Sequence, residues 1–107
     1  LFENIYNKSV YQATGESVAK YIKNSDRVLE CACGTGAISI FIAPVCKELI
    51  VSDYSVGMLK QAKKKLKNYD NIDYRRVDIT DIEAEDNSFD VVVQEMLYIF
   101  CRIRKGQ

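Results

Sequence analysis

The sequence predicts an α/β protein with a doubly wound parallel sheet. Two patterns indicate this fold class: apolar runs of strand length alternate with helical segments, and two of these runs end on an acid that is followed by a turn and a helix. Strands that alternate with helices along a chain form parallel sheets. We expect four strands in the spatial order 3-2-1-4, in one domain over residues 1–107 whose sheet is cut short after the fourth strand.

The first half of the chain is expected to hold two helices and a buried strand. Residues 14–23 place their apolar side chains on one helical face, with Thr14 as the N-cap. Residues 27–31 form a nearly continuous apolar run, which is typical of a parallel strand buried on both faces. Residues 36–45 repeat apolar side chains at spacings of three and four, which predicts a helix whose last turn is weakened by Pro44.

The second half adds three strands and one helix. Residues 48–53 form the second strand, and Ser55 is the expected N-cap of the helix after it. Alternation and β-branched side chains predict the third and fourth strands at residues 72–77 and 89–93. Five lysines crowd the outer face of the helix without interleaved aromatic residues, which favours a solvated surface over a nucleic-acid site. They are Lys60, Lys63, Lys64, Lys65 and Lys67.

Composition excludes several classes of protein. Fifteen basic and fifteen acidic residues give a formal net charge of zero, so no overall field favours nucleic acid or an anionic membrane. The longest apolar stretch, residues 37–46, is far shorter than the ~20 residues that span a bilayer. With 48% hydrophobic residues the chain can bury a core. We therefore expect a cytoplasmic protein without a membrane or nucleic-acid partner.

The cysteines are expected to be reduced and to hold no metal. The chain has no histidine and no Cys-x-x-Cys pair, so the commonest zinc and thiolate arrangements are missing. Reduced, mostly buried thiols are typical of cytosolic proteins. The four cysteines are Cys31, Cys33, Cys46 and Cys101.

A glycine-rich turn and a distant acid predict a ligand site at the carboxyl ends of two strands. Residues 28–36 read VLECACGTG, and the second strand ends on Asp53, seventeen residues beyond Gly36. Glycines let the backbone approach a ligand and the acid accepts hydrogen bonds from a ribose diol, so the pattern predicts a nucleoside-containing ligand. A nicotinamide dinucleotide fits less well, because the third glycine of its motif, read from Gly34, would fall at Ser39.

Three segments of the chain, in this order, resemble the motifs of one enzyme family. VLECACGTG, VSDYSVGML and VDITDIEAEDNSFDVVV together resemble the class I S-adenosylmethionine-dependent methyltransferases, over about residues 27–94. The resemblance implies a Rossmann-like sheet, S-adenosyl-L-methionine as the cofactor, and methyl transfer to a small-molecule or protein acceptor. The alternative is a module that keeps the nucleotide fold and binds or assembles without catalysing.

The same resemblance assigns roles to individual residues. It implies that Glu30 faces the ammonium end of the cofactor and that Asp53 accepts hydrogen bonds from the ribose hydroxyls. It implies that Asp78 accepts from the adenine amine and that Met58 packs on the adenine ring. The full set implied to bind the cofactor is Glu30, Ala32, Cys33, Gly34, Gly36, Asp53, Tyr54, Met58, Asp78, Ile79 and Gln94.

The chain departs from the family pattern at Ala32, and the residues that bind the methyl acceptor are given only as candidates. Ala32 occupies the place of the family's first glycine, and its methyl group is tolerable at negative φ and awkward at positive φ. The acceptor is expected to contact the segment after the fourth strand, where Gln94, Glu95 and Tyr98 are the polar candidates. No catalytic residue is identified.

The fourth strand is expected to form an open edge of the sheet. Residues 89–93 are apolar, β-prone and carry one charge, and they lack the lysines, proline or bulge that blunt native edges. This predicts a homodimer through that edge, an exchange of segments, or a longer polypeptide that completes the sheet.

Overall fold

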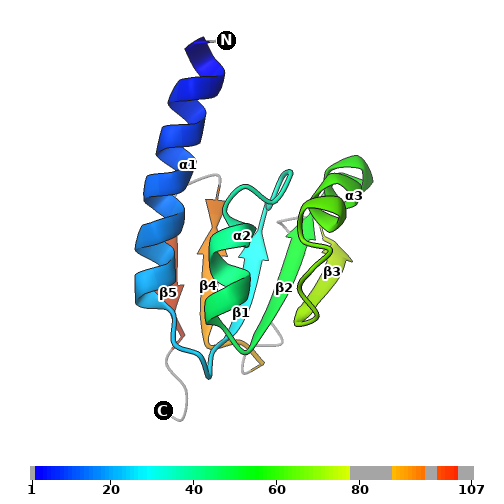
Figure 1. Ribbon diagram of the computed structural model, residues 1–107. Coiled ribbons are helices and arrows are strands. Elements are labelled where there is room, and N and C mark those ends of the chain that lie inside the picture. Colours follow the sequence, from blue (N-terminus) through cyan, green and yellow to red (C-terminus); the bar gives the residue numbers. More distant parts are fainter. Residues whose placement is uncertain (1, 78–87, 96–98, 104–107) are drawn as a thin grey trace.

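A five-stranded sheet covered by helices on one face makes up the described part of the chain (Figure 1). It comes from a computed structural model that describes residues 2–77, 88–95 and 99–103, with side chains from residue 9 onward. The strands are β1 (Arg27–Cys31), β2 (Glu48–Asp53), β3 (Ile72–Arg76), β4 (Val91–Gln94) and β5 (Ile99–Arg102). Their spatial order is β3-β2-β1-β4-β5, and the pairs among β1 to β4 are parallel. The predicted order 3-2-1-4 is therefore confirmed.

The strand β5 makes the expectation of an open edge at the fourth strand wrong. It pairs with β4 in the antiparallel sense, so that Val91 lies opposite Arg102 and Gln94 opposite Ile99. Phe100 packs against the main core, which gives this short strand an apolar anchor. Because β4 is hydrogen-bonded on both sides, it offers no free edge for the predicted dimer.

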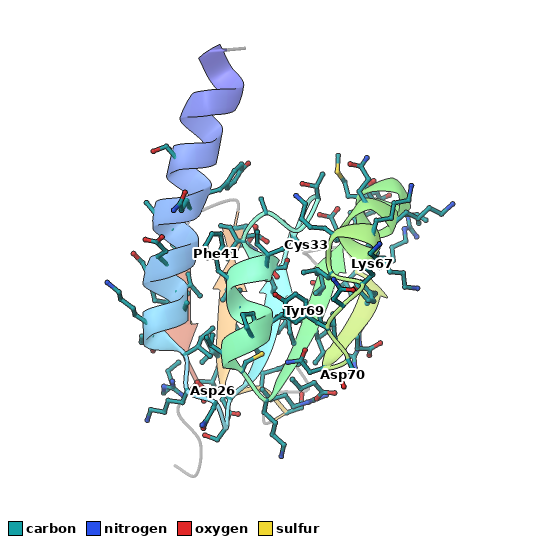
Figure 2. The ribbon with its side chains drawn as sticks, in the orientation of Figure 1. Asp26, Cys33, Phe41, Lys67, Tyr69 and Asp70 are labelled. Carbon is teal, nitrogen blue, oxygen red and sulfur yellow. The ribbon has the colours of Figure 1, made fainter. Side chains whose placement is uncertain are left out.

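The first helix is longer than predicted. It spans Phe2–Tyr21 as α1, so Thr14 lies inside the helix and is not its N-cap. Neither proline nor glycine interrupts the chain before Gly15, which lets the helix extend. At Gly15 the ring of Phe41 occupies the space of a side chain, because a Cβ built there would lie 2.2 Å from Phe41 Cδ2 (Figure 2).

The other helices match the prediction in place but not in length. The expected helix 36–45 is reduced to α2 (Ser39–Ile42) and a 3₁₀ turn, η1 (Ala43–Val45). The helix is short because the backbone before Ser39 is taken up by the glycine-rich turn and because proline at residue 44 has no N–H to donate. The third helix, α3 (Val56–Lys65), begins as predicted, with Ser55 Oγ accepting the Met58 N–H at 3.2 Å.

Buried side chains form two clusters on opposite faces of the sheet. The larger cluster joins the helices to one face, with Val18 from α1, Ile22 directly after α1, Ile42 from α2, and Leu66 at the end of α3. The smaller cluster contains Leu29, Cys31, Ile50 and Phe89. Within the described residues, no helix has both the length and the apolar character needed to cross a membrane.

A partly buried ion pair connects β5 to the residue before β1. The carboxylate of Asp26 is 3% exposed and receives both Arg102 guanidinium nitrogens, at 2.8 and 2.9 Å, together with the Lys23 N–H at 2.7 Å. The hydrogen bond from Arg102 holds the pKa of Asp26 below its usual range. The Arg102 guanidinium also lies over the Tyr21 ring, 5.3 Å from its centroid, so the same side chain contacts α1.

Replacing this arginine should destabilise the fold in a pH-dependent way. Arg102→Met leaves the Asp26 carboxylate buried without its cation, and we expect a loss of about 1–2 kcal/mol at pH 7, reduced by the partial exposure of Arg102. Because the folded pKa of Asp26 is lowered, the wild-type advantage is present above pH ~4 and is lost as the pH falls through the folded pKa. Urea unfolding from pH 7 to pH 2.5 measures this.

The exposed pair between Arg75 and Asp73 supplies the control. Arg75→Met should change the free energy of unfolding by less than ~0.5 kcal/mol at every pH. Equal losses for the two variants would contradict the structural role of the Asp26 pair.

Candidate cofactor site

The glycine-rich turn between β1 and α2 is held by backbone bonds to the neighbouring strand. The Cys33 N–H donates to the Ser52 carbonyl at 3.0 Å, and the Gly36 N–H donates to the Cys33 carbonyl at 3.0 Å. Ser52 Oγ in turn donates to the Glu30 carbonyl at 2.7 Å. The turn thus sits at the carboxyl ends of β1 and β2, and Figure 2 shows Cys33 at this end of the sheet and Asp26 at the other.

The two glycines of the turn face different surroundings. Both have positive φ, +56° at Gly34 and +88° at Gly36. A Cβ at Gly34 would meet no heavy atom within 4 Å among the described residues other than its chain neighbours, whereas one at Gly36 would lie 3.4 Å from the Ala62 Cβ on α3. Gly34 therefore borders open space where a ligand can approach, and Gly36 lets the turn pack against α3.

The backbone of Ala32 has a positive φ, which is the less favourable of the two conformations that the sequence left open. Its φ is +57°, in the left-handed region that disfavours residues with a Cβ. Among the described residues it is the only one other than glycine with positive φ. The turn therefore carries local strain at the position where the related family has a glycine.

Ala32→Gly should stabilise the protein. Removing the methyl group relieves the left-handed strain, and the greater freedom of glycine in the unfolded chain offsets part of the gain, which leaves about 0.5–1 kcal/mol. Ala37→Gly is the matched control, since Ala37 lies in the same turn without positive φ and should lose stability. Denaturant unfolding of both variants tests this, and a loss of stability in Ala32→Gly would contradict it.

Asp53 ties the glycine-rich turn to the loop after β2. Its Oδ2 accepts the Gly34 N–H at 2.8 Å, and its Oδ1 accepts the Ser55 N–H at 2.9 Å. Each carboxylate oxygen can accept a further hydrogen bond, so both remain available to a diol. The carboxylate is half-buried and fixed in orientation before any ligand binds.

Two large apolar side chains that follow Asp53 in the sequence are exposed. Tyr54 is 62% exposed and Met58 is 40% exposed. The Arg76 guanidinium lies over the Tyr54 ring at 4.8 Å and donates from Nε to the Tyr54 carbonyl at 2.9 Å. Exposed apolar side chains next to a fixed carboxylate form a surface suited to a flat aromatic ring.

A pocket of about 190 Å³ opens at the turn. Part of its lining comes from residues 32–35 of the turn and from Ala37. Two larger side chains complete it, Tyr11 from α1 and Glu95, which comes directly after β4. We call this space the turn pocket.

Two carboxyl groups meet next to the turn pocket. Glu30 is fully buried, and its Oε1 accepts the Ser39 hydroxyl at 2.5 Å. Glu30 and Glu95 influence each other's pKa. Burial raises the pKa of Glu30 and raises that of Glu95 to about 12. Glu30 was expected to face the ammonium end of the cofactor. Of these two acids, Glu95 is among the described residues that line the turn pocket and Glu30 is not, so the role of Glu30 stays a prediction.

Two cysteines at the turn, Cys31 and Cys33, and Cys46 after η1 are neutral thiols at physiological pH. Burial raises the pKa of Cys31 and Cys46 to about 11 and also raises that of Cys33. A thiolate is the nucleophilic form of cysteine, so these side chains act as small apolar groups. Cys33 contributes to the site through its backbone and its place in the pocket wall.

Of the remaining residues that were predicted to belong to the site, the structure describes Gln94 alone. Gln94 ends β4 opposite Cys31 and Ile99 and is half-buried. Asp78, Ile79 and Tyr98 lie outside the described residues. Their assignments stay predictions.

Sequence reasoning missed two contributors to the turn pocket. Tyr11 precedes the segment that was predicted to be helical, so no pattern linked it to the turn. Glu95 was considered only for the acceptor, although it comes after the strand that neighbours β1. The predicted strand order contained the signal for Glu95, because the carboxyl ends of adjacent parallel strands lie together.

Comparisons with known proteins agree with this geometry. Residues 28–105 match a family model described as a methyltransferase domain. A demethylmenaquinone methyltransferase of Clavibacter sepedonicus is 34% identical over 67 residues, covering 63% of this chain and 27% of the relative. The putative methyltransferase YqeM of Bacillus subtilis (strain 168) is 33% identical over 96 residues, covering 86% of this chain and 39% of the relative.

A solved structure shares the fold at low sequence identity. Haemonchus contortus phosphoethanolamine N-methyltransferase 1, in complex with phosphoethanolamine and S-adenosylhomocysteine, superimposes with a TM-score of 0.72 and 15% identity. The match covers 85% of this chain and 20% of that one. The chain thus spans between about a quarter and two fifths of the length of the two curated relatives named above.

Proposed function

Because the chain belongs to the methyltransferase-domain family, we propose that it is the cofactor-binding part of an S-adenosylmethionine-dependent methyltransferase. The methyl acceptor is a small molecule or a protein. In this proposal residues 1–107 form one cofactor-binding domain, and the acceptor contacts groups beyond the site described above. The named relatives are methyltransferases, and nothing in the comparisons supports the alternative of a non-catalytic module.

The observation that carries the proposal is the hydrogen bond between Asp53 and Gly34. It fixes an acid at the end of β2 next to a turn whose outer side is open at Gly34. A carboxylate in this position can accept two hydroxyl groups of a ribose while the glycine leaves room for the ligand backbone. A dinucleotide fold would need further room at a third glycine, where this chain has Ser39, fully buried and bonded to Glu30.

The size of the turn pocket and the exposure of two side chains support a placement of the three parts of S-adenosylmethionine. The turn pocket, at about 190 Å³, is smaller than the roughly 300–1,000 Å³ of a typical whole-ligand site and suits the amino-acid tail alone. Asp53 would hold the ribose, and the exposed Tyr54 and Met58 would contact the adenine. When bound, the cofactor supplies a methyl group on a positively charged sulfur, and the chain positions it for displacement.

Calorimetric titration with S-adenosylhomocysteine and with NAD tests this assignment. We expect S-adenosylhomocysteine to bind at least about tenfold more tightly, a difference of ~1.4 kcal/mol or more, because the site offers a diol acceptor and a small tail pocket but no dinucleotide turn. Tighter binding of NAD would overturn the proposal. S-adenosylmethionine serves as the third ligand and should behave like S-adenosylhomocysteine.

The location of the protein is a further part of the proposal. The four cysteines of the sequence are all free, and free thiols are typical of the reducing cytoplasm. The zero net charge gives no support to a nucleic-acid partner. We therefore propose a cytoplasmic enzyme that acts on a small molecule or a protein.

A further inference from the structure

A second pocket opens between the three helices that cover one face of the sheet (Figure 1). It has a volume of about 360 Å³ and is lined by Tyr11, Gln12, Ala37, Ile40, Phe41 and Lys65. Tyr11 and Ala37 also line the turn pocket, so the two spaces meet at these residues, and the other four line the second pocket and not the first. We call this second space the helix pocket.

The α2 side of the helix pocket is apolar. Ser39 and Ile42 are the buried residues of this helix, whereas Ile40 and Phe41 are only half-buried and line the pocket. The outer side of a surface helix normally carries polar side chains, so this one is unusual. The Phe41 ring occupies the space beside Gly15 of α1, which holds it between the two helices (Figure 2). Such a surface is suited to an aromatic ligand.

The polar groups of the helix pocket differ in charge between its α3 side and its α1 side. On the α3 side, Lys65 is exposed, and no carboxylate of the described residues lies within ion-pair distance of its ammonium. On the α1 side, Gln12 Nε2 donates to Glu16 Oε1 at 3.1 Å, so a carboxylate is bonded to the side chain that lines the pocket there. A ligand anion is therefore attracted to the α3 side and repelled from the α1 side.

The size of the helix pocket favours a small molecule over a protein partner. Its volume lies at the lower end of the roughly 300–1,000 Å³ that is typical of small-molecule sites. A stable protein–protein interface takes about 20–30 residues from each partner, far more than the few side chains that line this pocket. The ligand class that fits is therefore a compact apolar body with one anionic group.

We propose that the helix pocket binds a small aromatic carboxylate, whose ring lies on Ile40 and Phe41 and whose carboxylate meets the ammonium of Lys65. The apolar side chains supply the contact area, and the lysine selects the anion. Cofactor binding is assigned to none of these three residues, so the site is distinct from the proposed cofactor site and does not depend on it.

Two probes of the same shape, one charged and one neutral, test this proposal. 2-Naphthoate and 2-naphthamide are each titrated into the ¹⁵N-labelled protein at pH 7, and the backbone amide signals are followed by NMR. We expect 2-naphthoate to bind with a Kd of about 1 mM or below, the scale for a ligand of its size. It should bind about three- to fivefold more tightly than 2-naphthamide, the scale of an exposed ion pair. The largest shifts should fall at residues 40, 41 and 65.

Three variants separate the charge from the apolar contact. Lys65→Met keeps a long side chain without the ammonium, and it should lower the affinity for 2-naphthoate to that for 2-naphthamide and leave the latter unchanged. Ile40→Thr loses apolar area and should weaken both probes about threefold. Lys60→Met, at an exposed lysine of the same helix that does not line the pocket, is the control and should change neither affinity.

The outcomes that overturn this inference are specific to the helix pocket. They are an absence of shifts with 2-naphthoate, equal affinities for the two probes, largest shifts at residues 32–35 of the turn, or equal losses in Lys60→Met and Lys65→Met. The comparison of the two probes on the unchanged protein remains decisive if a variant fails to fold. None of these measurements uses S-adenosylhomocysteine, so the proposed function is tested separately.

Discussion

Gly34→Val is expected to abolish binding of S-adenosylhomocysteine while leaving the protein folded. Gly34 has φ of +56°, and a Cβ built there would meet no heavy atom of the described residues within 4 Å, apart from its chain neighbours. A valine there meets the ligand instead of the protein, and its β-branched side chain also disfavours the left-handed backbone. We expect the affinity to fall by more than about 100-fold, with ~1–2 kcal/mol of stability lost to strain.

Gly36→Val supplies the contrast to this variant. A Cβ at Gly36 would lie 3.4 Å from the Ala62 Cβ, so a larger side chain collides with α3. Gly36→Val should therefore lose stability more severely than Gly34→Val. Circular dichroism for folding and calorimetry for binding measure both effects. A Gly34→Val that binds normally would show that the open space at Gly34 is not the ligand site, and one that is unfolded would show that Gly34 is primarily structural.

The sheet could be predicted because its four parallel strands carry local patterns. Residues 27–31 and 48–53 are apolar runs that end at turns, and the structure places them as β1 and β2 at these bounds. The order 3-2-1-4 is the one that right-handed connections between such units produce. The strand β5 was not predicted, because its four residues alternate too briefly to be recognised and depend on tertiary contacts of Phe100 and Arg102.

The helices show where local patterns are insufficient. The predicted start at Thr14 relied on a capping residue, but the sequence before it has no helix breaker and α1 continues through it. The mid-helix Gly15, which would weaken an isolated helix, is explained only by the Phe41 ring packed against it. Tertiary packing decided both features, and a single sequence does not show it.

The candidate site also has one part that the sequence predicts and another that depends on tertiary packing. The contact between Asp53 and Gly34 could be anticipated, because adjacent parallel strands bring their carboxyl ends together. The turn pocket could not, since Tyr11 comes from a helix whose position depends on packing against α2. The positive φ of Ala32 was stated as one of two possibilities, and only the backbone decides between them.

Asp53→Ala is expected to weaken S-adenosylhomocysteine by about 1.5–3 kcal/mol, or roughly 10- to 150-fold. The variant removes the acceptor of the ribose hydroxyls and also leaves the Gly34 and Ser55 N–H groups without their present partner. The turn should therefore become looser, so a modest loss of thermal stability accompanies the loss of affinity. Calorimetry and thermal unfolding measure the two effects separately.

Asp53→Asn separates ligand recognition from support of the turn. The amide keeps one oxygen acceptor for either Gly34 or Ser55 but has no second acceptor for the diol. We expect it to recover most of the lost stability and only a small part of the lost affinity. Asp73→Ala, at an exposed acid of β3, controls for the loss of one negative charge and should bind normally. If Asp53→Ala loses stability but keeps its affinity, Asp53 supports the turn alone, and the nucleoside must be held elsewhere.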